Sequence, residues 1–114
     1  MNLSEIQRRI RVFRDERDWM QFHNPKNLAI SISLEAAELL EHFQWRSFED
    51  SERHAVEQKA QLSEEVADIA VYLLELCDNL EIDLESAILS KLEKNAAKYP
   101  AEKARGTAKK YTDL

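Results

Sequence analysis

At 114 residues, 44% hydrophobic and 33% charged, the chain is long enough for one domain with an apolar core and too apolar to be disordered. Its formal net charge of −6 argues against a surface that binds duplex nucleic acid. No apolar run of about 18 residues is present, so we expect no membrane-spanning segment. A single glycine, two prolines and no sustained alternation of apolar and polar residues predict a few long helices and no sheet.

The charge is distributed unevenly along the chain. Residues 1–90 contain nine Lys and Arg against nineteen Asp and Glu, a net charge of −10, whereas residues 91–114 contain seven against three, a net charge of +4. The basic end is therefore either a solvated terminus or a segment that reaches an anionic ligand held by the acidic part.

The single cysteine and the first residues indicate a reducing environment. Cys77 lies in the apolar stretch VYLLELC, where we expect a small buried side chain rather than a reactive thiol. The opening residues, MNLSEIQRRIRVF, lack the apolar core of a signal peptide. We therefore expect a cytoplasmic protein.

The first two predicted helices are marked by capping residues. Ser4 followed by Gln7 is typical of a capping box and begins a first helix that runs to about Asp15. The pair Asn24–Pro25 is typical of an N-cap and a first helical residue, and it begins a second helix that runs to about Gln44.

Two more helices complete the expected fold. Residues 45–52, WRSFEDSE, are predicted to be a polar connection, and a third helix runs from about Glu52 to Cys77 or Asp78. Asp83 can cap a fourth helix, which ends near Tyr99 because the following proline disfavours helical backbone. Four amphipathic helices with short connections predict an all-α four-helix bundle. We expect residues 1–100 to form this domain and residues 101–114 to be its basic tail.

The second and third helices carry acids on the stripe that should be buried. Glu35 and Glu65 each have apolar neighbours three and four residues away on that stripe, and Glu38 and Asp68 follow them by three residues. If the two faces meet, four carboxylates converge, and they must then be partly protonated or bind a hard cation. The alternative is that these acids border the core and reach water.

The ligand types restrict which metal such a site could bind. Carboxylate oxygens alone favour Mg²⁺, Mn²⁺ or Ca²⁺ over zinc. A di-iron bundle would carry a Glu three residues before a His on two helices, and none of His23, His42 and His54 has a Glu there. We therefore do not expect di-iron chemistry.

The acidic segments EAAE, residues 35–38, and EEVAD, residues 64–68, resemble the ExxE and ExxD metal motif of the MazG-like all-α nucleoside triphosphate pyrophosphohydrolases. The flanking stretches ERDWMQFHNPKNLA, ELLEHFQWRS, SKLEKNAAKYP and RGTAKKYTDL resemble its single-domain, dCTP-hydrolysing branch, so the similarity covers nearly the whole chain. The resemblance implies a MazG-like bundle completed by assembly into a homodimer or homotetramer. It also implies hydrolysis of a nucleoside triphosphate, dCTP or a related dNTP, to the monophosphate and pyrophosphate, which would remove particular nucleotides from the cellular pool.

The same resemblance assigns roles to individual residues. Mg²⁺, with Mn²⁺ as a substitute, would be bound by catalytic carboxylates, where it offsets phosphate charge and activates a water. These carboxylates are Glu35, Glu38, Glu65 and Asp68. The triphosphate would contact Lys91, Asn95, Lys98, Tyr99, Arg105, Lys109, Lys110 and Tyr111. The base would contact Trp19, His23, Trp45 and Tyr72. Without the resemblance, the cationic residues would be interpreted as a solvated surface and the aromatic residues mainly as core.

One position departs from the family pattern. Mammalian members carry a histidine in the first helix where this chain has Ile10, so a strict preference for cytosine does not follow from the resemblance. Two other functions stay open: a helical adaptor, which would neither bind nor hydrolyse nucleotides, and a Mg-nucleotide sensor, which would bind them without hydrolysis.

Overall fold

The computed structural model describes residues 1–114 and contains helices and turns but no strand, which confirms the predicted all-α class. The elements in chain order are α1 (Leu3–Glu16), the 3-10 helix η1 (Met20–Phe22), α2 (Pro25–Glu41), α3 (Phe48–Glu57), α4 (Lys59–Asn79), α5 (Leu84–Lys98), α6 (Ala101–Ala104) and the 3-10 helix η2 (Tyr111–Asp113). They form two compact units, residues 1–81 and residues 82–114. None of these helices combines the length and the apolar character that crossing a membrane would require.

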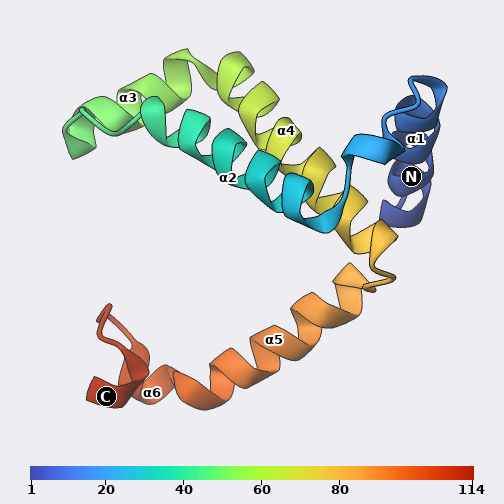
Figure 1. The fold of residues 1–114 in the computed structure, drawn as a ribbon. Coiled ribbons are helices and arrows are strands. Elements are labelled where there is room, and N and C mark those ends of the chain that lie inside the picture. Colours follow the sequence, from blue (N-terminus) through green and yellow to red (C-terminus); the bar gives the residue numbers. More distant parts are fainter. The chain divides into compact units, whose positions relative to one another are not determined.

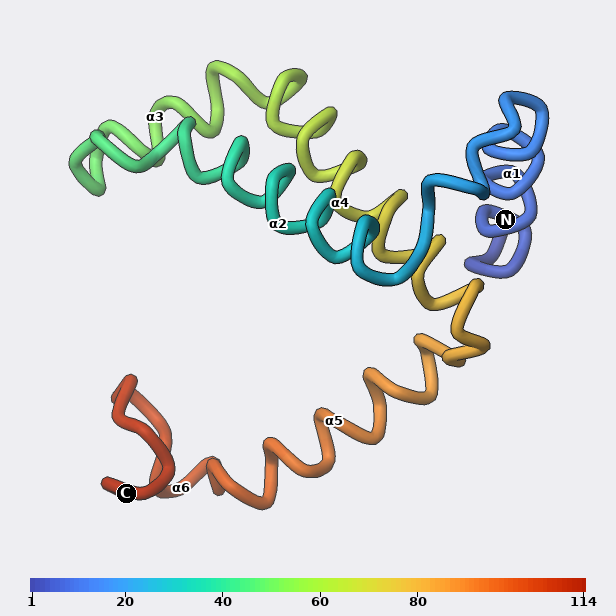
Figure 2. Tube along the Cα trace, viewed as in Figure 1, coloured from blue at the N-terminus to red at the C-terminus, as the bar shows by residue number.

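The first unit is built on two antiparallel helices. In Figure 1, α2 and α4 run side by side in opposite directions, and α1 lies at the end where α2 begins and α4 finishes. The tube in Figure 2 shows the same arrangement without the ribbons. Leu28 of α2 and Leu74 and Cys77 of α4 are the buried hydrophobic residues, so the small core lies near this end. The buried position predicted for Cys77 is confirmed, and burial raises the pKa of its thiol.

Polar contacts attach α1 to α4. Gln7 Nε2 donates a hydrogen bond to the carbonyl oxygen of Leu74 at 3.0 Å, and Arg11 Nη1 lies 2.6 Å from Asp78 Oδ1.

The predicted capping box at the start of α1 is wrong. Asn2, not Ser4, is the N-cap, and the Gln7 amide satisfies a carbonyl of α4 instead of its own helix.

The predicted starts of α2 and α5 are confirmed. Asn24 Oδ1 accepts a hydrogen bond from the N–H of Asn27 at 2.9 Å, and Pro25 occupies the first helical position. Asp83 Oδ1 accepts from the N–H of Ser86 at 3.2 Å. The α2 helix ends at Glu41, three residues earlier than predicted, and residues 42–45 form turns.

The structure has two helices, α3 and α4, where the sequence predicted a polar connection and one long third helix. The α3 helix begins at Phe48, because the hydroxyl of Ser47 accepts a hydrogen bond from the N–H of Asp50 at 3.2 Å. The chain leaves helical geometry at Gln58, with φ −110° and ψ 29°, and α4 then runs in a different direction (Figure 1). No Gly or Pro marks this break, so the local sequence gave no signal for it.

The second unit joins α5 to the basic end of the chain. The predicted end of α5 before Pro100 is confirmed. Lys98 Nζ lies 5.0 Å from the centroid of the Tyr111 ring, and the rings of Tyr99 and Tyr111 meet edge to face at a centroid distance of 6.0 Å. Gly106 has φ +77°, a left-handed conformation that a glycine adopts without strain, and it lies in the turn that follows α6.

The capping of α3 leads to a first prediction. Ser47→Ala removes the acceptor of the Asp50 N–H and should cost about 1 kcal/mol, which corresponds to roughly fivefold faster amide hydrogen exchange in residues 48–57. Ser47→Asp restores a capping oxygen and should leave the exchange near that of the wild type. Unchanged protection of α3 in Ser47→Ala would show that this cap does not hold the helix.

Candidate active site

Three acids of α2 and α4 converge where the two helices pack together. Glu35, Glu38 and Glu65 each offer a carboxylate oxygen, and the three oxygens lie within 4.8 Å of one another. Asp68 follows Glu65 by one turn on the same helix, and its charge acts on Glu35. The structure thus brings together three of the four carboxylates that the sequence selected, with the fourth close by.

The electrostatics of this cluster are unfavourable without a cation. Burial raises the pKa of Glu35, and the hydrogen bond to Glu38 and the charges of Glu38, Asp68 and Glu65 raise it further. Burial also raises the pKa of Glu65, again with contributions from Glu38 and Asp68, and His42 opposes them. Glu35 Oε2 and Glu65 Oε2 are buried without a hydrogen-bond partner. Unsatisfied carboxylate oxygens close together are a ligand set that fits a hard divalent cation.

A mostly apolar pocket of about 480 Å³ adjoins the acid cluster. It lies between α1, the connection that follows α1, and α4. Asp68 forms part of the pocket wall, so the pocket borders the acid cluster. Trp19, His23 and Tyr72 line it too; the ring centroids of Trp19 and His23 are 6.2 Å apart and those of His23 and Tyr72 are 6.3 Å apart. Three of the four predicted base-binding residues therefore share one pocket.

Trp45, the fourth predicted base-binding residue, is not part of that pocket. Its side chain is 88% exposed, in the turns that follow α2. Ile10, the position that departs from the mammalian pattern, does line the pocket.

The connection after α1 has a defined conformation that places Trp19. Asp18 adopts φ +53°, which an aspartate tolerates, and Gln21 Nε2 donates to the Asp18 carbonyl at 2.9 Å. The N–H of Trp19 donates to the carbonyl of Arg14 at 3.1 Å, and its ring meets Phe13 edge to face at 5.8 Å. The reversal of the chain at Asp18 therefore folds Trp19 back against α1.

A buried charged group lies beside the aromatic pocket. Glu75 of α4 is only 2% exposed, and His23 Nδ1 lies 2.9 Å from its Oε1. Arg14 of α1 is 7% exposed, and its Nη1 lies 3.8 Å from Glu75 Oε1. The same Nη1 donates a hydrogen bond to Asn79 Oδ1 at 3.0 Å. The roles of Arg14, Glu75 and Asn79 were not predicted from the sequence. A signal did exist, because Glu75 and Asn79 continue the three-and-four spacing of Glu65, Asp68 and Tyr72 along α4.

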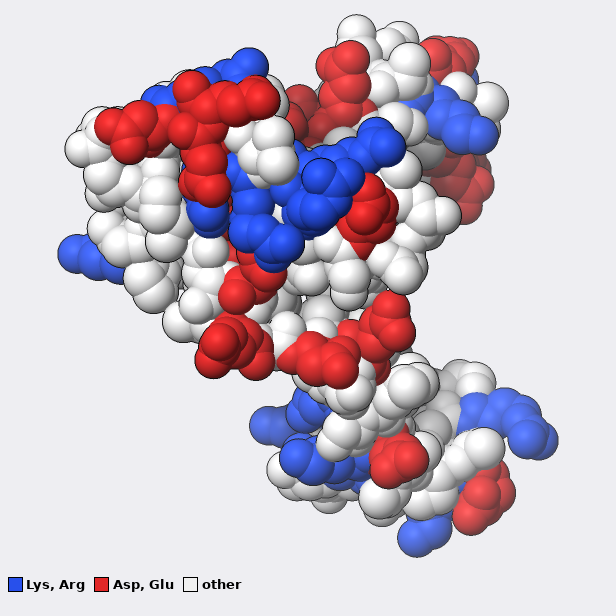
Figure 3. Space-filling view, turned by 90° about the vertical axis from the view of Figure 1, so that its right-hand side faces the viewer, with Lys and Arg blue, Asp and Glu red and all other residues white.

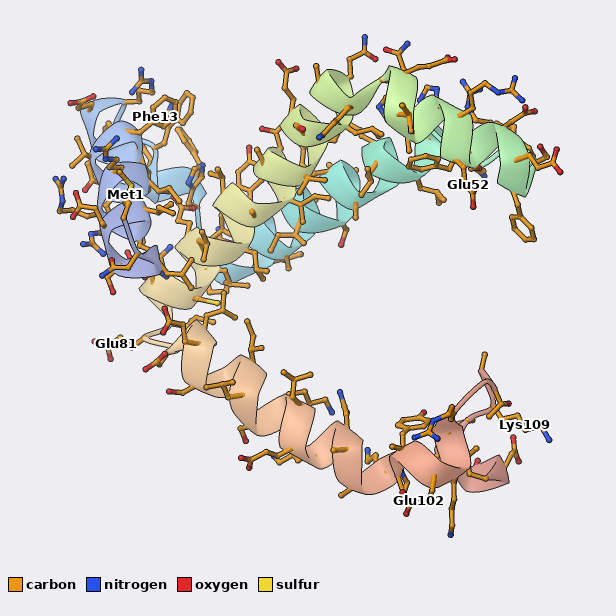
Figure 4. The ribbon with its side chains drawn as sticks, turned by 180° about the vertical axis from the view of Figure 1, so that it is seen from behind. Met1, Phe13, Glu52, Glu81, Glu102 and Lys109 are labelled. Atoms are coloured by element: carbon orange, nitrogen blue, oxygen red, sulfur yellow. The ribbon has the colours of Figure 1, made fainter.

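A second, polar pocket of about 330 Å³ lies at the α3 end of the unit. It is lined by Glu38, Glu41, His42, Arg46, His54 and Glu65. His42 Nδ1 and His54 Nε2 are 2.8 Å apart, and burial, followed by the charges of Arg46 and His42, lowers the pKa of His54. Figure 4 labels Phe13 at the α1 end of the unit and Glu52 on α3 at the opposite end. Asp68 lines the pocket at the α1 end, and Glu38 and Glu65 line the pocket at the α3 end, so the acid cluster lies between two different pockets. The grouping of Arg46, His42 and His54 was not predicted, because it depends on the bend at Gln58, which brings α3 to the end of α2.

The residues predicted to contact phosphate belong to the second unit. These are Lys91, Asn95, Lys98 and Tyr99 in and after α5, and Arg105, Lys109, Lys110 and Tyr111 near the end of the chain. Within that unit Lys98, Tyr99 and Tyr111 contact one another. In the first unit, Lys and Arg gather on the face where α1 lies, with Asp and Glu around them (Figure 3).

The comparison with protein families decides which family this arrangement represents. Residues 30–114, which include both acidic segments, match the MazG-like family. The chain belongs to the MazG-like family.

Relatives of this MazG-like protein carry the names of pyrophosphatases. It is 41% identical to dCTP pyrophosphatase 1 of Mus musculus over 114 residues, which cover 98% of this chain and 67% of that protein. The corresponding protein of Homo sapiens is 40% identical with the same coverage. A crystal structure of a pyrophosphatase from Archaeoglobus fulgidus is 49% identical and superposes with a TM-score of 0.82, covering 85% of this chain and 91% of that one. This likeness confirms the MazG-like all-α fold.

The acid cluster predicts how stability depends on pH when no metal is present. Glu35 and Glu65 have raised pKa values, so the folded state keeps protons that the unfolded state releases above the ordinary carboxyl value of 4.5. Their contribution to stability is therefore greatest below pH 4.5 and is lost as the pH rises through the raised values. Glu35→Gln should raise the Tm in EDTA at pH 8 and change it little at pH 4, as measured by circular dichroism.

Glu64→Gln is the matched control, because Glu64 is an exposed neighbour of the cluster on α4. It should leave the Tm nearly unchanged at both pH values. A Glu35→Gln protein that is less stable than wild type at pH 8 in EDTA would contradict the proposed repulsion.

Proposed function

We propose that this protein is a Mg²⁺-dependent pyrophosphohydrolase that converts deoxynucleoside triphosphates, dCTP or a related dNTP, to the monophosphate and pyrophosphate. The observation that carries the proposal is the convergence of three carboxylate oxygens within 4.8 Å beside an aromatic pocket. The relatives named dCTP pyrophosphatase 1 support the reaction and the substrate class. Such an activity would limit particular nucleotides in the cellular pool.

The acid cluster is the proposed metal centre. Glu35, Glu38 and Glu65, together with Asp68, would hold Mg²⁺, and Mn²⁺ could substitute because it prefers the same oxygen ligands. When bound, the metal supplies positive charge for the phosphate oxygens and a water with a lowered pKa. Glu35 and Glu65 are half-buried, whereas Glu38 is exposed.

The pocket beside the cluster is the proposed base site. Trp19 and Tyr72 offer flat surfaces for a base, and His23 between them offers a polar contact. Asp68 borders both the pocket and the acids, so a nucleotide with its base in the pocket has its phosphates near the metal ligands. We assign residues 1–100 to the catalytic domain and residues 101–114 to its basic tail. Charge-assisted contacts to the triphosphate are assigned to Lys91, Asn95, Lys98, Tyr99, Arg105, Lys109, Lys110 and Tyr111.

Pyrophosphate release from a panel of dNTPs tests this function. Glu38→Gln and Asp68→Asn keep the shape of the side chain but remove a negative ligand. Each should lower kcat/KM by at least about a hundredfold, the equivalent of about 2.7 kcal/mol in the transition state. Glu64→Gln, an exposed acid next to the cluster, should keep normal activity. Circular dichroism should show unchanged helicity in all three variants.

The alternatives give different results in the same assay. A Mg-nucleotide sensor would bind dNTPs without releasing pyrophosphate, and a helical adaptor would neither bind nor hydrolyse them. Near-normal turnover by a folded Glu38→Gln protein would rule out the carboxylate centre.

We also propose that the active protein is a homo-oligomer, a dimer or a tetramer. Only Leu28, Leu74 and Cys77 are buried hydrophobic residues, while large apolar side chains such as Leu34, Leu89 and Leu92 are exposed. Covering one such side chain is worth roughly 1.5–3 kcal/mol, which favours association of these surfaces. Trp45, exposed in a single chain, would then reach a base held by a neighbouring subunit.

Light scattering coupled to gel filtration tests the assembly. The wild type should have a multiple of the 13.3 kDa chain mass. The double change Leu89→Glu and Leu92→Glu places charges on the apolar face of α5 and should lower that mass, whereas Ser90→Glu, an exposed residue of the same helix, should not. A wild-type mass of one chain would contradict the proposal.

A further inference from the structure

The contact between His23 and Glu75 fixes which nitrogen of the imidazole carries a proton. Nδ1 of His23 lies 2.9 Å from Glu75 Oε1 and 2.8 Å from Oε2. A carboxylate can only accept at such distances, so Nδ1 is the donor. In the neutral ring the other nitrogen, Nε2, then has no proton and is a hydrogen-bond acceptor.

Glu75 is held in place by a second residue, Arg14, which lines the same pocket. Glu75 is 2% exposed, and Arg14 supplies a positive charge 3.8 Å away. Arg14 is itself fixed by Asn79, to which it donates at 3.0 Å, and by Asp15 at 2.9 Å. A buried carboxylate with a cation beside it stays a fixed acceptor, and this makes the orientation of the His23 ring a property of the fold.

Nε2 is the polar atom that His23 has left for a ligand. No side chain or backbone group of the protein forms a hydrogen bond with it, whereas Nδ1 is engaged by Glu75. The ring lines the aromatic pocket between Trp19 and Tyr72. An acceptor in a mostly apolar pocket forms a hydrogen bond with an amino group and repels a carbonyl oxygen.

We propose that Glu75 is a positioning residue that fixes the tautomer of His23, and that the pocket thereby selects cytosine, which has a 4-amino group, over uracil and thymine, which have a 4-carbonyl. This inference rests on the proposed function, because it places the base of a dNTP in this pocket. It gives the chain a means of base selection that does not depend on a histidine at the position of Ile10. Sites that hydrogen-bond a substrate group discriminate strongly against an analogue that cannot form the bond, so a preference of at least about tenfold in kcat/KM is expected.

Steady-state kinetics with dCTP and dUTP at pH 8 test the selection in the full-length protein. The wild type should prefer dCTP by at least about tenfold. Glu75→Leu removes the carboxylate that fixes Nδ1–H, and the preference should fall towards equality while turnover of dUTP persists. Glu64→Leu makes the same replacement at an exposed position of α4 and should keep the preference.

A second variant and a spectroscopic measurement keep the inference testable if Glu75→Leu does not fold. His23→Phe keeps a flat ring without the acceptor and should also lose the preference. Nitrogen-15 NMR of the wild-type imidazoles, with the His23 signals assigned by their loss in His23→Phe, should show a protonated Nδ1 and an unprotonated Nε2 at pH 8.

The outcomes separate this inference from the proposed function. Hydrolysis of dCTP and dUTP at equal rates, or a folded Glu75→Leu protein with the full preference, would overturn the inference and leave the pyrophosphohydrolase intact. A protein that hydrolyses no dNTP would contradict the proposed function, and the NMR measurement would then test only the tautomer of His23. A proton on Nε2 would overturn the proposed role of Glu75, and a proton on Nδ1 would support that role.

Discussion

The packing of α2 against α4 forces carboxylates that repel one another into one partly buried volume. The metal-free fold would be more stable with an apolar residue in place of Glu35 or Glu65, since burial and like charges raise the pKa of both. The fold tolerates this because the rest of the interface is ordinary apolar packing around Leu28 and Leu74. A bound cation would convert the repulsion into attraction, so the least favourable part of the metal-free fold is also its proposed chemical centre.

The unit contains buried and half-buried acids in two different environments. Glu75 has a cation and a histidine within hydrogen-bonding or ion-pairing distance, Arg14 and His23, and both come from the chain itself. Glu35 is affected by other acids alone and Glu65 by other acids and His42, and each keeps an oxygen without a hydrogen-bond partner. Glu75 also keeps one oxygen, Oε2, without a hydrogen-bond partner, but the arginine and the histidine beside it hold it in place, so it can position a neighbour. The charges of Glu35 and Glu65 face other acids and favour a ligand from outside.

One face of α4 connects these sites. Its polar residues follow one another at spacings of three and four, and they meet in turn the acids of α2, the aromatic pocket and the arginine of α1. They are Glu65, Asp68, Tyr72, Glu75 and Asn79. A single rigid helix therefore sets the distance between the proposed metal centre and the proposed base site, and a change in its register would disturb both.

The sequence by itself determined the features that depend on neighbouring residues. The caps at Asn24 and Asp83 and the end of α5 before Pro100 follow from local backbone chemistry, and the ExxE and ExxD spacings place acids on one helix face whatever the packing. Only the tertiary structure decided the break at Gln58, where no breaker residue stands, and the diversion of the Gln7 amide to α4. It also decided that Arg14, His23 and Glu75 meet, because residues more than fifty positions apart come together only through the packing of α1 on α4, which local propensities do not encode.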